Sequence, residues 1–183
     1  LVCYGNHETS ILKHQETDPI QRFVDLFNYK NNTSLYSGGY GGWVVIRFAD
    51  KHNAGSKSYN IKYFHGAGGG GPVTKGTIQN QRMMAQTQNA DLIWMGHVHE
   101  LYTMFHSVEY LNKNNSIKLK DVLHIRTSTY KEEFDEHYMG YHVERGRPPK
   151  PLGCYMLNLS LSKHKDELNN RSLKIYAKPI VLK

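Results

Sequence analysis

The sequence contains little cysteine. Its 183 residues include only Cys3 and Cys154, which are too far apart in the chain to form a Cys-x-x-Cys pair. This excludes a zinc site built on paired cysteines and a disulfide-rich secreted fold. Both cysteines lie in apolar runs, so we expect buried, reduced thiols. Reduced thiols favour a reducing compartment, and we expect a cytoplasmic location.

The sequence also lacks a hydrophobic run long enough to cross a membrane. Hydrophobic residues still make up 39% of the chain, which is enough to form a folded core rather than a disordered polymer. We therefore expect a folded domain with no membrane partner.

Acidic residues are in deficit. The chain has 16 aspartates and glutamates against 23 lysines and arginines, giving a formal net charge of +7. Such a balance favours polyanionic partners such as nucleic acid. A basic protein without a polyanionic partner remains the alternative, because net charge does not specify a ligand.

The hydrophobic pattern predicts alternating strands and helices. Tyr59 to Phe64 alternates as a half-buried strand does, whereas Ile20, Phe23, Val24 and Phe27 recur at helical spacing after Pro19. The order of elements predicts an α/β sandwich, with 1–183 forming part of one domain. We expect strands at 1–4, 43–48, 59–64, 91–95, 101–108, 117–125, 155–161 and 173–180, helices from residue 19 and over 77–89 and 131–138, and turns at 50–58 and 112–115.

Three polar segments follow predicted strands: Gly5 to Glu8, the single His65, and Gly96 to His99. Imidazole nitrogens and amide oxygens are good ligands for manganese, iron, zinc or nickel. His97 and His99 are two residues apart, so in an extended loop they would point in different directions and reach different ions of a close pair. One such histidine alone is more often an ordinary surface or core residue, but three signals at three strand ends favour a metal site.

These segments resemble the third, fourth and fifth motifs of the calcineurin-like metallophosphoesterase family. Gly5 to Glu8 (Gly-Asn-His-Glu) matches the Gly-Asn-His-Asp/Glu motif, His65 matches the single-histidine motif, and Gly96 to His99 matches Gly-His-x-His. The resemblance implies a β-sandwich flanked by helices and a centre of two divalent metal ions, with manganese favoured over iron, zinc or nickel.

The resemblance also implies a role for each matched residue. Asn6, His65 and His97 would bind one ion, and His99 would bind the other. His7 would stabilise the transition state or protonate the leaving group, while Glu8 would orient its neighbours.

The sequence departs from the family pattern at its start. The family has Asp-x-His and Gly-Asp-x-x-Asp motifs upstream of Gly-Asn-His, and they supply most ligands of the second ion; neither precedes Gly5 here. Leu1 to Tyr4 has the pattern of the last part of a buried strand. We therefore expect this chain to be the C-terminal part of a domain, with the remaining ligands supplied by an N-terminal segment or by a second polypeptide.

Other residues suggest how a phosphate substrate is held. Lys75 ends a glycine-rich segment beside His65, and Arg126 follows a predicted strand, so both are candidates for substrate contacts. Arg145 to Arg147, with Lys150, forms a basic loop that would suit single-stranded nucleic acid, although a solvated basic rim explains it equally well.

The sequence therefore predicts metal-dependent hydrolysis of phosphate esters, by a phosphodiesterase or nuclease acting on a substrate such as DNA or RNA. A protein phosphatase is a second enzymatic reading. The alternative from another class is a non-catalytic scaffold that keeps the fold and binds a partner protein.

Overall fold

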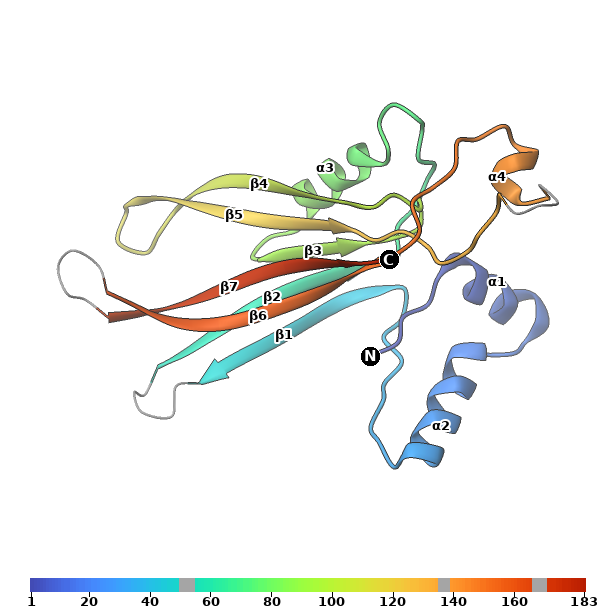
Figure 1. Ribbon diagram of the computed structural model, residues 1–183. Helices are drawn as coiled ribbons and strands as arrows, with labels where there is room; N and C mark the ends of the chain where they lie inside the picture. The colour runs from blue at the N-terminus through green and yellow to red at the C-terminus, as the bar shows by residue number, and fades with distance from the viewer. Residues whose placement is uncertain (50–54, 135–138, 166–170) are drawn as a thin grey trace.

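The computed structural model of the protein describes residues 1–49, 55–134, 139–165 and 171–183 (Figure 1). Its helices are α1 (Asn6–Gln15), α2 (Pro19–Asn31), α3 (Thr77–Gln86) and α4 (Tyr141–Glu144). Its strands are β1 (Gly41–Ala49), β2 (Ser56–Phe64), β3 (Leu92–Met95), β4 (Tyr102–Leu111), β5 (Ile117–Arg126), β6 (Cys154–Lys165) and β7 (Arg171–Leu182).

Five strands form one mixed sheet in the order β1-β2-β3-β5-β4. The three central strands β2, β3 and β5 are parallel, and β1 and β4 flank them in antiparallel pairing. The strands β6 and β7 form a separate antiparallel hairpin. The protein is thus a mixed α/β structure with few helices, as the order of elements predicted.

The five-stranded sheet is covered on both faces. Tyr59, Ile61, Leu92, Leu123 and Ile125 form a buried cluster on the face that packs against the β6–β7 hairpin. On the opposite face, Met83 and Met84 of α3 pack against a second cluster that includes Ile93 and Met95. Figure 1 shows α3 above β4 and β5, and it shows the β6–β7 hairpin drawn across β2, between β3 and β1.

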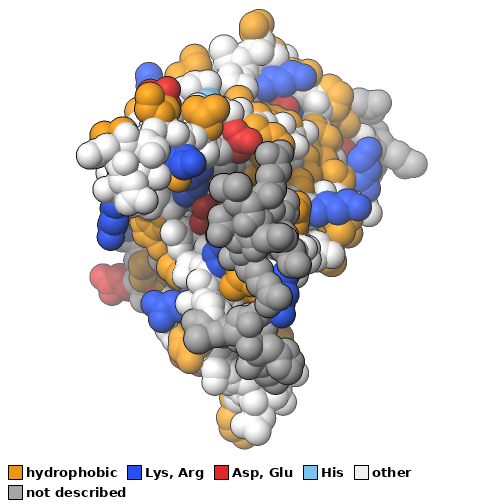
Figure 2. All heavy atoms as spheres, turned by 90° about the vertical axis from the view of Figure 1, so that its left-hand side faces the viewer, with side chains coloured by type: hydrophobic (Ala, Val, Ile, Leu, Met, Phe, Trp, Pro, Cys, Tyr) orange, Lys and Arg blue, Asp and Glu red, His pale blue; other side chains and the backbone are white. Residues whose placement is uncertain are grey.

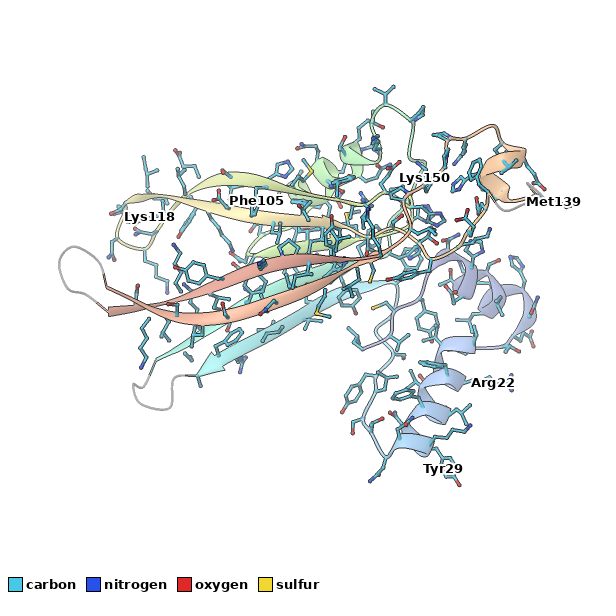
Figure 3. The ribbon with its side chains drawn as sticks, viewed as in Figure 1. Arg22, Tyr29, Phe105, Lys118, Met139 and Lys150 are labelled. Carbon is cyan, nitrogen blue, oxygen red and sulfur yellow. The ribbon has the colours of Figure 1, made fainter. Side chains whose placement is uncertain are left out.

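Hydrophobic side chains reach the surface at one end of the molecule. Figure 2 views the molecule from the tips of the long strands and shows hydrophobic side chains interspersed with lysine and arginine side chains. Phe105 of β4 and Lys118 of β5 belong to the hairpin that these two strands form (Figure 3). No helix within the described residues is long and apolar enough to cross a membrane.

The helix α2 begins where the sequence predicted. Asp18 adopts an extended backbone and its carboxylate accepts a hydrogen bond from the backbone N–H of Gln21 at 2.9 Å, so it caps the helix, and Pro19 occupies the first turn. The Tyr4 hydroxyl donates to the same carboxylate at 2.7 Å, which ties the N-terminal segment to α2.

The N-terminal prediction was wrong in two places. Residues 1–4 form no regular strand; Val2 makes a single parallel bridge to Ser37. The segment 5–8 is not a loop, because α1 begins at Asn6. The Glu8 carboxylate accepts a hydrogen bond from the Gly5 backbone N–H at 2.9 Å, which satisfies a donor at the start of this helix.

Two further helix predictions need correction. The helix predicted over 77–89 ends at Gln86, because Thr87 turns to an extended backbone. The helix predicted over 131–138 is absent from its described part, 131–134, and the rest of it lies outside the described residues. Of the turn expected at 50–58, residues 50–54 also lie outside the described residues, and 56–58 belong to β2.

The expectation of buried thiols was also wrong. Cys3 is exposed and Cys154 is partly exposed, and both are free. Cys3 lies in the short N-terminal segment, which has little cover, and Cys154 opens β6 at the sheet edge, where its sulfur accepts a hydrogen bond from the Tyr130 hydroxyl at 3.2 Å.

Candidate metal centre

Three side chains of types that can bind a metal ion converge at one end of the sheet. The His65 Nε2 atom lies 2.9 Å from the Asn6 Oδ1 atom, and His97 Nδ1 lies 3.2 Å from the same oxygen. The two imidazole nitrogens are 3.3 Å apart. These residues are separated by 59 and 32 positions in the chain, so the fold itself brings them together.

The parallel strands place the two histidines. Phe64, Met95 and Arg126 pair in register, so β2, β3 and β5 end at the same level and their following loops lie side by side. The backbone N–H of Gly96 donates to the His65 carbonyl at 2.9 Å and locks the two loops together. This edge, beyond the carboxyl ends of parallel strands, is where open α/β sheets place ligand sites.

Two glycines allow the close approach. A Cβ atom on Gly5 would lie 2.9 Å from His65 Cε1, and one on Gly66 would lie 2.6 Å from His97 Cβ. Gly66 also has a φ of +121°, a backbone conformation that residues other than glycine rarely adopt. A larger residue at either position would displace a donor of the cluster.

The loop after β3 is not extended, contrary to our expectation. His97 has a φ of +74° and His99 a φ of +55°, so both adopt the left-handed conformation, which is strained for a residue other than glycine. The two side chains nevertheless face different neighbours: His97 lies against Asn6 and His65, while His99 lies 5.5 Å, centroid to centroid, from the ring of His142.

The environment favours the neutral form of these imidazoles. Burial lowers the pKa of His65, and the nearby His97 lowers it further. Burial is also the largest cause of the lowered pKa of His97 and of His99. A neutral imidazole has a lone pair free for a metal ion, so the lowered pKa favours the form that binds metal.

His7 and Glu8 lie beside the cluster on α1. His7 is exposed, and its charge lowers the pKa of both His65 and His97, which places it within electrostatic reach of the donors. Glu8 caps the helix through Gly5 and raises the pKa of His65. The structure thus brings both predicted residues to the same end of the sheet as the three donors.

Arg126 is buried, whereas we expected it to be available for substrate contacts. Its side chain is 0% exposed, and the guanidinium donates to the Gly96 carbonyl at 2.8 Å, to the Gly76 carbonyl at 3.1 Å and to Asn80 Oδ1. The position at the buried end of a central strand explains the difference. Arg126 therefore supports the backbone next to His97 from below and does not face a substrate.

Lys75 lies on the surface beside this end of the sheet. It lines a cavity of about 270 Å³ between the glycine-rich segment and the proline-rich loop. A neighbouring cavity of about 260 Å³ is lined by Gly69 to Pro72 together with Arg147. Lys150 lines both cavities, and its ammonium forms an ion pair with the buried Glu100 (Figure 3 labels Lys150).

Sequence reasoning missed two buried residues near His99. Glu133 accepts hydrogen bonds from the His142 backbone N–H at 2.8 Å and pairs with His142 Nδ1 at 2.5 Å. They lie in a short polar segment without hydrophobic periodicity, so no sequence pattern indicated them. Their contact depends on tertiary packing alone.

The three convergent donors fit one divalent ion. Donors about 2.1 Å from a shared ion are about 3.0 Å apart in an octahedron and about 3.4 Å apart in a tetrahedron. The observed separations of 2.9, 3.2 and 3.3 Å fall within that range. Among the described residues, no group of three or more His, Cys, Asp or Glu side chains is placed to hold a metal ion, so an ion between His65 and His97 would need the amide oxygen of Asn6 as its third donor.

Comparisons with known proteins give no further guide to this site. No family model, no curated protein and no solved structure matches the chain.

Proposed function

We propose that this protein is a metal-dependent phosphoesterase of the calcineurin-like metallophosphoesterase type, hydrolysing phosphodiesters. The observation that carries the proposal is the convergence of Asn6 Oδ1, His65 Nε2 and His97 Nδ1 within 3.3 Å of one another at the carboxyl end of the sheet. A scaffold that only binds a partner would not need three neutral metal donors in this arrangement.

The residues of the first site would be Asn6, His65 and His97, with His99 on the side of a second ion. Divalent ions bound at such a pair of sites stabilise charge on phosphoryl oxygens and lower the pKa of a bound water. The carboxylates that complete a second site in the family belong to motifs that do not precede Gly5 in this sequence. We propose that another polypeptide segment supplies them.

The protein's own side chains would contribute the remaining chemistry. His7 is exposed beside the donors, so its imidazole can donate a proton or a hydrogen bond to the leaving oxygen as the phosphorus–oxygen bond breaks. Arg126, through its bond to the Gly96 carbonyl, fixes the loop that carries His97 and His99. Glu8 fixes the start of α1, and with it the position of Asn6 and His7.

Nucleic acid is the substrate class that the surroundings favour. Lys75 and Arg147 line adjacent cavities near the donors. Arg145 and Arg147 each lie 5.5 Å from the ring of Tyr141, which is exposed and offers a flat surface for a base. With a net charge of +7, these groups suit a polyanionic strand better than a small neutral ester.

The test is manganese-dependent hydrolysis of bis(p-nitrophenyl) phosphate and of single-stranded DNA. We expect activity with Mn²⁺, loss on chelation by EDTA, and recovery when Mn²⁺ is restored. His65→Ala should remove the activity because it deletes a central donor, whereas His14→Ala, which changes an exposed histidine on α1, should not. Equal activity in wild type and His65→Ala would contradict the assignment.

The substrate class has its own test. Binding of a single-stranded oligonucleotide should weaken linearly with the logarithm of the salt concentration, with a slope of about −0.7 per phosphate contacted. Arg147→Ala should make that slope shallower by about one contact. Binding that ignores salt, together with hydrolysis of the small ester, would favour a small-molecule substrate.

A further inference from the structure

A second histidine pair lies on the other side of the loop after β3. The ring of His142, on α4, stands perpendicular to that of His99, with the centroids 5.5 Å apart and an interplanar angle of 90°. His142 and its partner Glu133 are each only 6% exposed. The Glu133 carboxylate therefore orients a buried imidazole that lies next to a second imidazole.

The ring spacing of this pair is close to that of the His65–His97 pair. The rings of His65 and His97 have centroids 5.2 Å apart at an interplanar angle of 71°. Two imidazoles that bind one ion at about 2.1 Å, at the tetrahedral angle, have centroids about 5.3 Å apart. The His99–His142 spacing therefore suits two ligands of one ion as well as the His65–His97 spacing does.

Glu133 determines which nitrogen of His142 is available. Its carboxylate pairs with His142 Nδ1 at 2.5 Å and also accepts from the backbone N–H of the same residue. A proton held on Nδ1 leaves the lone pair on Nε2, which makes no hydrogen bond to the described residues. A carboxylate that orients an imidazole and raises its basicity is the usual arrangement behind a metal-bound histidine.

The backbone is built to hold this contact. A Cβ atom on Gly140 would lie 2.4 Å from the Glu133 Cβ and 2.5 Å from its carbonyl oxygen, so only glycine lets the chain cross here. The ammonium of Lys131 lies 2.6 Å from the other oxygen of Glu133 and fixes the carboxylate. Both features hold Glu133 in the position that orients His142.

We propose that His142, oriented by Glu133, is a ligand of the second metal ion together with His99. This inference rests on the proposed function, since it concerns the second ion of that centre. It assigns a metal-binding role to a residue that lies outside all three motifs of the sequence. The ion would be of the kind that imidazole prefers, such as Mn²⁺ or Zn²⁺.

The test counts bound Mn²⁺ by electron paramagnetic resonance of the free ion in titrations of the protein. The variant is His142→Asn, because the asparagine amide can still donate to Glu133 but offers no ring nitrogen to a metal. We expect wild type, together with the segment that supplies the carboxylates, to bind two ions. His142→Asn should bind the first with unchanged affinity and the second at least about tenfold more weakly.

The control is His14→Asn, which removes an exposed histidine of α1 and should leave both affinities unchanged. If His142→Asn bound the second ion with wild-type affinity, the inference would be overturned and the first site would stand. The same conclusion would follow if wild type bound a single ion that was lost in His97→Ala and retained in His142→Asn. Absence of Mn²⁺ binding in wild type would overturn the proposed function itself.

If circular dichroism shows that His142→Asn does not fold, Glu133→Gln decides the question. This variant keeps an acceptor for the His142 backbone N–H but removes the carboxylate charge. Glu133→Gln should also lower the affinity for the second ion by about tenfold, and an unchanged affinity for that ion would overturn the inference.

Discussion

Two of the close histidine pairs among the described residues, His65–His97 and His106–His124, are carried by strands of the five-stranded sheet or by the loops that follow them, and they differ in what surrounds them. His65 and His97 lie beyond the carboxyl ends of β2 and β3, with ring centroids 5.2 Å apart and an amide oxygen between their nitrogens. His106 and His124 lie within β4 and β5, with centroids 4.7 Å apart. Neither ring nitrogen of His124 has a hydrogen-bond partner among the described residues.

The difference shows that placement decides the role of a histidine pair. At the strand ends, loops bring a third donor, two glycines clear the space, and the rings remain partly exposed. Inside the sheet, His124 is 1% exposed and has no third donor beside it, so its polar nitrogens only reduce stability. We therefore expect the two pairs to respond to substitution in opposite ways.

The largest expected effect is the loss of activity in His97→Ala. This change removes one of the three donors, and an ion contributes several kcal/mol to transition-state stabilisation. A loss of about 4 kcal/mol corresponds to about a thousandfold in kcat/KM. His124→Leu, measured with the same phosphodiester, should retain wild-type activity, and the comparison fails if both variants lose activity equally.

Next in size is the destabilisation caused by Arg126→Met. The methionine has a similar length but removes three hydrogen bonds of a charged donor. The Gly96 and Gly76 carbonyls keep the backbone N–H groups of Val98 and Gln79, whereas the Asn80 amide oxygen loses its donor. Because an unpaired buried group costs about 1–3 kcal/mol and a hydrogen bond to a charged group contributes about 1.5–3 kcal/mol, we expect the free energy of unfolding to fall by about 4 kcal/mol. Urea denaturation measures the change, and an unchanged midpoint would show that these bonds contribute nothing net.

A pH dependence of similar size should come from His124. Burial, together with the charges of His106 and Arg126, which face it from β4 and β5, lowers its pKa to about 4 from 6.5. The unfolded chain therefore takes up a proton below pH 6.5 that the folded protein does not. The stabilisation is full above pH 6.5 and is lost as the pH falls to 4, by about 3 kcal/mol.

The pH measurement needs a matched variant, because other groups titrate over the same range. The difference in unfolding free energy between wild type and His124→Leu, from urea denaturation at several pH values, isolates this residue. We expect the leucine variant to gain relative stability steadily as the pH falls from 6.5 to 4. A constant difference across that range would contradict the lowered pKa.

The smallest expected effect is that of His124→Leu near neutral pH. It replaces two unpaired buried nitrogens with an apolar side chain of comparable size, between Val122 and Ile125 in the core. We expect a gain of about 1 kcal/mol, seen as a higher melting temperature. A clear loss would show that the imidazole makes a favourable packing contact that leucine cannot replace.

The sequence predicted most of the sheet because its strands carry strong local signals. The alternation in 59–64 and the apolar run in 91–95 each correspond to a strand, β2 and β3. The helix α1 was missed because the composition of its first residues is typical of a loop. Its start is stabilised by a hydrogen bond from the Gly5 backbone N–H to the Glu8 carboxylate, which the sequence pattern did not indicate.

The candidate site was predictable only in part. The three donors meet because His65 and His97 follow parallel strands and Asn6 follows a segment beside them. The ends of strands can be inferred from the hydrophobic pattern, so this part of the site was predictable. Arg126 lies at the end of a central strand, and its side chain is buried. No sequence pattern distinguishes such a buried position from one that could contact a substrate. Glu133 and His142 meet through a crossing at Gly140, which sequence spacing does not reveal.

The most direct test of the account is anomalous diffraction at the manganese edge from crystals grown with Mn²⁺. The account predicts a peak about 2.2 Å from Asn6 Oδ1, His65 Nε2 and His97 Nδ1, with the three side chains placed as described here. No peak among these atoms at saturating Mn²⁺, or a peak only at exposed surface histidines, would contradict it.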